Sequence, residues 1–84
     1  MKSHENPDAH DTLTAREREI LQFFASGLGT ATIAKRLAIS PVTVRNHSQR
    51  ILAKLGVHSR LAAVARGYTL RLIVAPLAKR ESLS

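Results

Sequence analysis

The stretch SPVTVRNHSQRILAKLGV, residues 40–57, contains the start, the body and the end of one helix. Ser40 is a favourable N-cap, and Pro41 suits the first helical position because its missing N–H would have no partner there. Gly56 suits the left-handed residue that follows a helix, and Val57 can pack back on the last turn. We therefore predict a helix that begins after Ser40 and ends before Gly56.

This helix is predicted to have two chemically different faces. At about 100° per residue, the inward face consists of Val44, Ser48, Ile51 and Leu55, with Leu52 at its edge. The opposite arc consists of Val42, Arg45, Asn46, Gln49, Arg50 and Ala53. No Asp or Glu occurs in residues 40–80. Because a solvated helix face usually mixes charges of both signs, the arc is a candidate surface for a polyanion, and a merely solvated basic face is the alternative.

Two shorter helices are predicted before it. The first begins after Thr14, which forms a T-x-x-E capping box with Glu17, and it ends near Ser26. Its apolar stripe consists of Ile20, Leu21 and Phe24. The charged residues 16–19 are interpreted as a solvated face. The second helix spans about residues 30–37, and its inward side chains are Ile33, Ala34 and Leu37.

The second and third helices are joined by three or four residues, which is the length of a helix-turn-helix connection. A fourth helix is predicted to start with Ser59 as its N-cap and to end or kink before Pro76. Its expected inward stripe is Leu61, Val64, Ala65, Tyr68 and Leu72. A second apolar strip on its other side consists of Ala63, Leu70 and Val74. This strip suggests a partner surface, and scattered exposed aliphatic side chains are the alternative.

The length of 84 residues allows one small domain. We predict an all-α, four-helix domain over residues 13–75, with a tail or linker over 1–12 and a C-terminal tail over 76–84. Residues 1–20 carry three basic and five acidic side chains, whereas residues 21–84 carry ten basic and one acidic. This asymmetry indicates a polyanionic partner, either nucleic acid or an anionic membrane surface.

The composition argues against several other classes of protein. Cys is absent and the four His residues lack metal-ligand spacing, so no disulfide, metal or cofactor is predicted. The chain lacks both an apolar run of roughly 20 residues and the hydrophobic stretch of a signal peptide. A cytoplasmic, nucleoid-associated protein is therefore expected. An enzyme is not expected, because Glu81 is the only carboxylate side chain in residues 21–84.

Together, the runs LTAREREIL, IAKRL, TVRNH and ILAKLGVHSR resemble the DNA-binding domain of the LuxR/FixJ family of bacterial transcription regulators. The likeness covers about residues 13–72. It implies a helix-turn-helix domain whose third helix lies in the major groove and whose fourth helix commonly mediates dimerisation. The sequence departs from the family pattern at Gly29, Thr32, Ser48, Ala62 and Gly67. Departures that remove acids at helix starts make the face expected to bind DNA more positive.

The resemblance also implies roles for individual residues in binding double-stranded DNA. Base contacts are implied for Arg45, Asn46 and Gln49, whose side chains can pair with guanine or adenine in the major groove. Phosphate contacts are expected from the flank of the third helix and from the starts of the second and fourth helices, namely Thr30, Thr43, His47, Arg50, Lys54, Ser59 and Arg60. A weak homodimer, completed on DNA, is expected through Ala63, Leu70 and Val74.

Two rival classes stay open at this point. One is a protein-interaction module, such as a sigma-like fragment that binds RNA polymerase. The other is a membrane-surface peptide, although mutual packing of several helices already accounts for the apolar stripes. Relatives often carry an N-terminal receiver or ligand-binding domain, so the chain is interpreted as either a short stand-alone regulator or an excised output domain. The sequence specifies neither the operator, nor the controlling signal, nor the choice between activation and repression.

Overall fold

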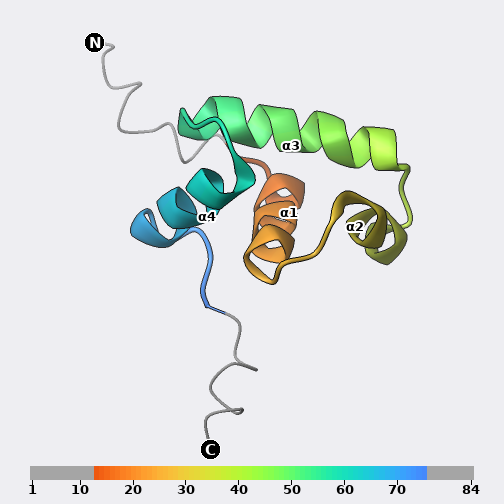
Figure 1. The fold of residues 1–84 in the computed structure, drawn as a ribbon, viewed down its shortest axis with the longest axis horizontal. Coiled ribbons are helices and arrows are strands. Elements are labelled where there is room, and N and C mark those ends of the chain that lie inside the picture. The colour runs from red at the N-terminus through yellow and green to blue at the C-terminus, as the bar shows by residue number, and fades with distance from the viewer. Residues whose placement is uncertain (1–12, 76–84) are drawn as a thin grey trace, which may run out of the picture.

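The computed structural model describes residues 13–75, and all regular structure in this range is helical. Its four helices are α1 (Ala15–Ala25), α2 (Thr30–Leu37), α3 (Pro41–Leu55) and α4 (Arg60–Thr69). In Figure 1 the long α3 lies across one side of the molecule, with α1 beneath its middle and α2 and α4 toward its two ends. The predicted all-α, four-helix architecture is confirmed. The tails predicted over 1–12 and 76–84 lie outside the described residues.

The side-chain caps predicted for α1 and α3 are confirmed. Thr14 Oγ1 accepts a hydrogen bond from the Glu17 N–H at 3.0 Å, and Glu17 Oε1 accepts one from the Thr14 N–H at 3.0 Å. These two bonds complete the capping box of α1. Ser40 Oγ accepts a hydrogen bond from the Thr43 N–H at 3.1 Å, and Gly56 ends α3 in the left-handed conformation with φ of 69°.

The connection between α2 and α3 is a tight turn of three residues, 38–40. Its first residue, Ala38, has a left-handed φ of 58°, a conformation that Gly adopts more readily. The Ile39 N–H donates to the carbonyl of Ala34 at 3.0 Å, which closes the end of α2. Ile39 also packs against the core. The predicted helix-turn-helix connection is therefore confirmed.

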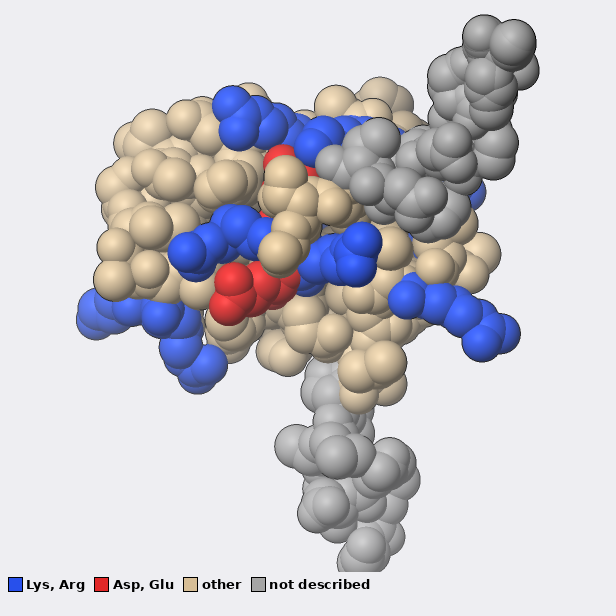
Figure 2. Space-filling view, turned by 180° about the vertical axis from the view of Figure 1, so that it is seen from behind, with Lys and Arg blue, Asp and Glu red and all other residues tan. Residues whose placement is uncertain are grey.

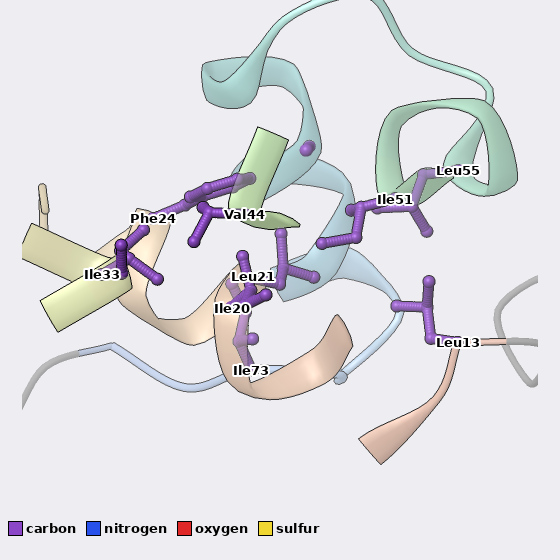
Figure 3. Close-up of a cluster of buried hydrophobic side chains, with 11 residues drawn as sticks. Leu13, Ile20, Leu21, Phe24, Ile33, Val44, Ile51, Leu55 and Ile73 are labelled. Carbon is purple, nitrogen blue, oxygen red and sulfur yellow. The ribbon is translucent and has the colours of Figure 1, made fainter. Parts of the chain in front are cut away.

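The hydrophobic core lies between α1 and the inward face of α3, with contributions from α2, α4 and both ends of the described range (Figure 3). Ile20, Leu21 and Ile51 have no exposed surface at all. Within residues 13–75 the buried hydrophobic residues are Leu13, Ile20, Leu21, Phe24, Ile33, Ala34, Val44, Ile51, Leu55, Ala63 and Ile73. All four residues predicted for the inward face of α3 are buried.

Ser48 is the one polar side chain on the inward face of α3. Its hydroxyl donates a hydrogen bond to the carbonyl of Val44 at 2.9 Å, one turn back. The buried hydroxyl is therefore satisfied within its own helix.

The buried face predicted for the fourth helix is wrong. Ala63, which was expected on an outward strip, is fully buried, and Gly67 faces the core one turn later. Leu61 and Tyr68, which were expected to face inward, are 79% and 39% exposed. Val64 and Leu72 of the predicted stripe are partly buried against the core, but Leu61, Ala65 and Tyr68 are exposed. The helix therefore packs mainly through the side that carries Ala63 and Gly67.

The outward strip of Ala63, Leu70 and Val74 consequently does not form. Besides the burial of Ala63, α4 ends at Thr69, so the last two residues of the strip lie beyond the helix. Arg71 adopts a left-handed φ of 60°, and the chain turns back on the end of the helix. Val74 is exposed, whereas Leu70 is half-buried against the core.

Ile73, which lies beyond the end of α4, explains why the buried face of this helix differs from the predicted one. A Cβ atom placed on Gly67 would lie 3.0 Å from Ile73 Cδ1 and 3.0 Å from Leu21 Cδ2. Gly67 thus leaves the space that Ile73 fills, and Ile73 is 5% exposed. The packing of the turned-back segment decides which face of α4 is buried.

Gln22 of α1 holds this turned-back segment in place. Its Nε2 donates to the Val74 carbonyl at 2.7 Å, and its Oε1 accepts from the Val74 N–H at 3.2 Å. One side-chain amide therefore satisfies both polar groups of one backbone residue. Hydrogen bonds to α1 therefore hold the chain past α4 as far as Val74.

We expect Gly67→Ala to destabilise the fold by about 1 to 3 kcal/mol, because the new methyl group overpacks the contact with Ile73 and Leu21. The gain in helix propensity, about 1 kcal/mol, offsets only part of this cost. Thermal or urea unfolding measures the change. In an Ile73→Ala background the same substitution should cost clearly less, and an equal cost in both backgrounds would show that Ile73 does not pack on Gly67.

Candidate nucleic-acid interface

The outward arc of α3 is exposed along its whole length. The exposed residues on it are Val42, Arg45, Asn46, Gln49, Arg50 and Ala53, as the sequence predicted. The opposite face of the same helix is buried in the core. The helix therefore presents guanidinium and amide groups, and no carboxylate, on a rigid support.

Two further predicted contact residues, Thr43 and His47, are half-buried on the flank of this arc. The Thr43 hydroxyl lies 2.9 Å from Ser40 Oγ and shares a hydrogen bond with it. His47 Nδ1 is buried and has no hydrogen-bond partner among the described residues. A contact from His47 to an external group would therefore have to use Nε2.

Lys54, a third predicted contact residue on the flank, pairs with a residue of α1. Its Nζ lies 2.8 Å from Glu17 Oε1, and the Glu17 side chain is only 2% exposed. The interpretation of the charged residues 16–19 as a solvated face is thus wrong for Glu17. The helical period indicates this burial, because Glu17 precedes Ile20 and Leu21 by three and four residues and so shares their inward face.

Burial alone would raise the pKa of Glu17, but the hydrogen bonds from Lys54 and from the Thr14 N–H hold it below its ordinary value. The nearby positive charge of Lys54 acts in the same direction. Glu17 is therefore a carboxylate at neutral pH, and it ties the start of α1 to the last turn of α3.

Arg60, at the start of α4, links three other elements. Its guanidinium carbon lies 4.6 Å from the centre of the Phe24 ring, a distance at which a cation and an aromatic face attract each other. Its Nη2 donates to the hydroxyl of Thr30 at the start of α2. Its Nη1 lies 3.5 Å from the carbonyl of Leu28. Arg60 and Thr30, both predicted from sequence as phosphate contacts, are thus brought together.

The starts of α2 and α4 differ in their side-chain caps, but both lack a compensating negative charge. Gly29 provides no side-chain cap for α2, whereas Ser59 Oγ accepts the Ala62 N–H at 3.1 Å in α4. Neither helix has an acidic residue in its first turn. Positive helix-dipole ends therefore meet beside Arg60, an arrangement that favours an anion.

The described residues contain ten Lys and Arg side chains but only two acids, Glu17 and Glu19. Figure 2 shows basic side chains spread over one face of the molecule, with acidic atoms confined to small areas beside them. Within residues 13–75, no group of three or more His, Asp or Glu side chains could hold a metal ion. None of the four helices has both the length and the apolarity that crossing a bilayer requires.

The short α2, the three-residue turn and the long exposed α3 together define a helix-turn-helix domain. Residues 11–66 match the family described as bacterial regulatory proteins, luxR family. The chain belongs to this family, and the family resemblance inferred from its sequence motifs is confirmed.

Individual relatives agree with this assignment. The chain is 48% identical over 61 residues to the probable transcriptional regulatory protein NarL of Mycobacterium tuberculosis, an alignment that covers 73% of this chain and 28% of NarL. It is 46% identical over 54 residues to the transcriptional regulatory protein DesR of Bacillus subtilis, covering 64% of this chain and 27% of DesR. The chain thus spans less than a third of the length of these relatives.

Two solved structures have the same fold. The transcription factor GerE superposes with a TM-score of 0.71 at 40% identity, over 74% of this chain and 92% of GerE. The response regulator ChrA, of a heme-sensing two-component system, superposes with a TM-score of 0.72 at 45% identity, over 74% of this chain and 31% of ChrA. DNA-binding transcription regulation is accordingly the function of this class of domain.

The ion pair between Glu17 and Lys54 predicts a pH-dependent stability. Because the pKa of Glu17 is lowered in the folded state, its contribution is present above the unfolded value of about 4.3 and is lost as the pH falls through the folded value. Glu17→Gln retains a capping-box residue but removes the charge. We expect it to cost about 1 to 3 kcal/mol at pH 7, with the difference from the wild type shrinking as the pH falls below the unfolded value.

Glu19→Gln is the matched control, because Glu19 is 50% exposed and lies 3.7 Å from Arg16 on the surface. Such exposed pairs contribute little to stability, so this change should leave the unfolding curve almost unaltered. Equal effects of the two substitutions, or an effect of Glu17→Gln that does not vary with pH, would contradict the assigned role of Glu17.

Proposed function

We propose that this domain binds double-stranded DNA sequence-specifically, with α3 lying in the major groove. The observation that carries the proposal is the exposed arc of α3, with Arg45, Asn46 and Gln49 at its centre and the opposite face of the helix in the core. The major groove, about 12 Å wide, accommodates one helix. The domain would act in the cytoplasm, where bacterial DNA and RNA polymerase are found.

The three central side chains of the arc are proposed to read bases. Arg45 can fork to guanine O6 and N7, whereas Asn46 and Gln49 can each pair with adenine N6 and N7. All three are exposed and project from one regular helix. Because the core holds the supporting helix in place, these side chains would enter the groove with little loss of backbone conformational entropy.

The remaining predicted contacts are proposed to bind phosphates. Arg50 is exposed on the arc, and Thr43, His47 and Lys54 lie along its flank. Since Glu17 already offsets the charge of Lys54, we expect Arg50 to contribute more to the salt dependence of binding than Lys54. The joined starts of α2 and α4 supply a second phosphate site through Thr30, Ser59 and Arg60.

A weak homodimer, completed on DNA, is proposed through the outward stripe of α4. This outward stripe consists of the exposed residues Leu61, Ala65 and Tyr68, and it replaces the strip predicted from sequence. The stripe spans only two turns of one helix, so free association should bury less than the roughly 1,200 Å² typical of stable interfaces. Neighbouring half-sites would raise the effective concentration enough to bring the two stripes together.

Asn46→Ala and Gln49→Ala should each reduce discrimination between a selected DNA site and random DNA by about 1 to 3 kcal/mol, through loss of a bidentate base contact. Arg50→Ala should instead weaken binding to all sequences about equally and lower the salt slope by about one. Fluorescence anisotropy at several salt concentrations measures both quantities. Undiminished discrimination in both amide variants would exclude the proposed reading role.

Tyr68→Asp should abolish cooperative binding to a site with two half-sites, while binding to a single half-site and the melting temperature stay nearly unchanged. The reason is that the charge lies within the proposed dimer stripe, about two turns from the phosphate-binding start of α4. Thr69→Asp, which adds the same charge at the neighbouring exposed position, is the control and should retain cooperativity. Cooperativity that survives Tyr68→Asp would place the dimer contact elsewhere.

A further inference from the structure

We infer that Val42 is a specificity-determining residue that contacts the C5-methyl group of a thymine in the major groove. This inference rests on the proposed DNA binding by α3. It adds an apolar contact, at one end of the recognition arc, to the polar contacts proposed for the three central side chains.

The placement of Val42 is the first observation. Val42 is 56% exposed, and it is the only large hydrophobic side chain of α3 with this much exposure. Arg45, Asn46 and Gln49 follow it by three, four and seven residues, which puts all four on one side of the helix. The arc of α3 that is proposed to reach base edges through Arg45, Asn46 and Gln49 therefore also carries an aliphatic side chain in the first turn of the helix.

The fold gives no reason for a valine at this position. Val42 does not belong to the hydrophobic core or to the partly buried residues packed against it. Val is also a poorer helix former than Ala by several tenths of a kcal/mol. A side chain that costs helix stability and adds nothing to the hydrophobic core is better explained by a contact made outside the domain.

The first turn of α3 holds Val42 rigidly. Ser40 caps the turn through the Thr43 N–H at 3.1 Å, and the two hydroxyls lie 2.9 Å apart. Pro41 occupies the first helical position. A β-branched Val in a helix is largely confined to one rotamer, so its two methyl groups would meet DNA with little loss of conformational entropy.

The chemistry of the major groove selects thymine as the partner. Every base pair offers hydrogen-bond donors or acceptors there, but only the thymine of an A·T pair adds a methyl group. An aliphatic side chain against a purely polar base edge would remove water without replacing its hydrogen bonds, which is unfavourable. Against a methyl group it buries apolar surface instead.

The experiment uses duplex DNA of the sequence most enriched by wild-type protein from a random library. Each thymine is replaced in turn by uracil, which removes only the methyl group. One replacement should weaken wild-type binding about fourfold, the factor that corresponds to about 0.8 kcal/mol for one buried carbon. In Val42→Ala the same replacement should change affinity by less than about 1.5-fold, and the melting temperature should not fall.

Arg50→Ala is the control for affinity, since it should weaken binding overall yet retain the fourfold uracil effect. The inference is overturned if no uracil replacement affects the wild type, or if the effect is equally large in Val42→Ala. Those outcomes leave DNA binding by α3 intact. Failure of the wild type to enrich any sequence from the library would instead contradict the proposed function itself.

Discussion

The packing of α3 against α1 determines what the rest of the domain can do. Val44, Ile51 and Leu55 of α3 are buried together with the apolar stripe of α1 (Figure 3). Burying one such aliphatic side chain stabilises a fold by about 1.5 to 3 kcal/mol. Rotating α3 about its axis would expose several of them, so the orientation of its opposite arc is strongly determined.

This constraint explains how a small core can support recognition. The side chains on the arc of α3 need no partners inside the domain, because the buried face of the same helix already holds them in place. The short turn over residues 38–40 then sets the position of α2 beside α3. Both helices are thereby presented to a ligand as one rigid unit, and sites on rigid elements are the more accurately positioned.

Two polar links complete the arrangement at its borders. Glu17 ties Lys54 to the start of α1, and Arg60 joins the starts of α2 and α4 across the ring of Phe24. A partly buried ion pair contributes less to net stability than its short distance suggests, because both charges lose water. Its geometric role is clearer, since Lys54 is positioned by α1 rather than by α3 alone.

The first three helices were predictable from sequence because each has one apolar stripe, and the first and third also have clear end signals, such as Thr14, Ser40 and Gly56. The fourth helix was not, since it carries apolar residues on two sides and periodicity alone cannot choose between them. The choice depends on Ile73, which returns from beyond the helix to fill the space at Gly67.

The sequence likewise predicted some features of the candidate DNA-binding site and not others. The exposure of the α3 arc followed from the helical period, because one stripe was apolar and the other was not. The partners of Lys54 and Arg60 come from segments more than 25 residues away along the chain. Such long-range pairs depend on the final packing of helices, which local sequence patterns do not specify.

The most direct test of DNA recognition by α3 is a nuclear magnetic resonance titration of labelled protein with a duplex selected from a random library. We predict that the largest shifts occur in the side-chain amides of Asn46 and Gln49 and in backbone amides of the first turns of α2, α3 and α4. Exposed residues away from these elements, such as Glu19 and Ser26, should shift little. Shifts centred on α1 or on the segment after α4, with both side-chain amides unmoved, would contradict it.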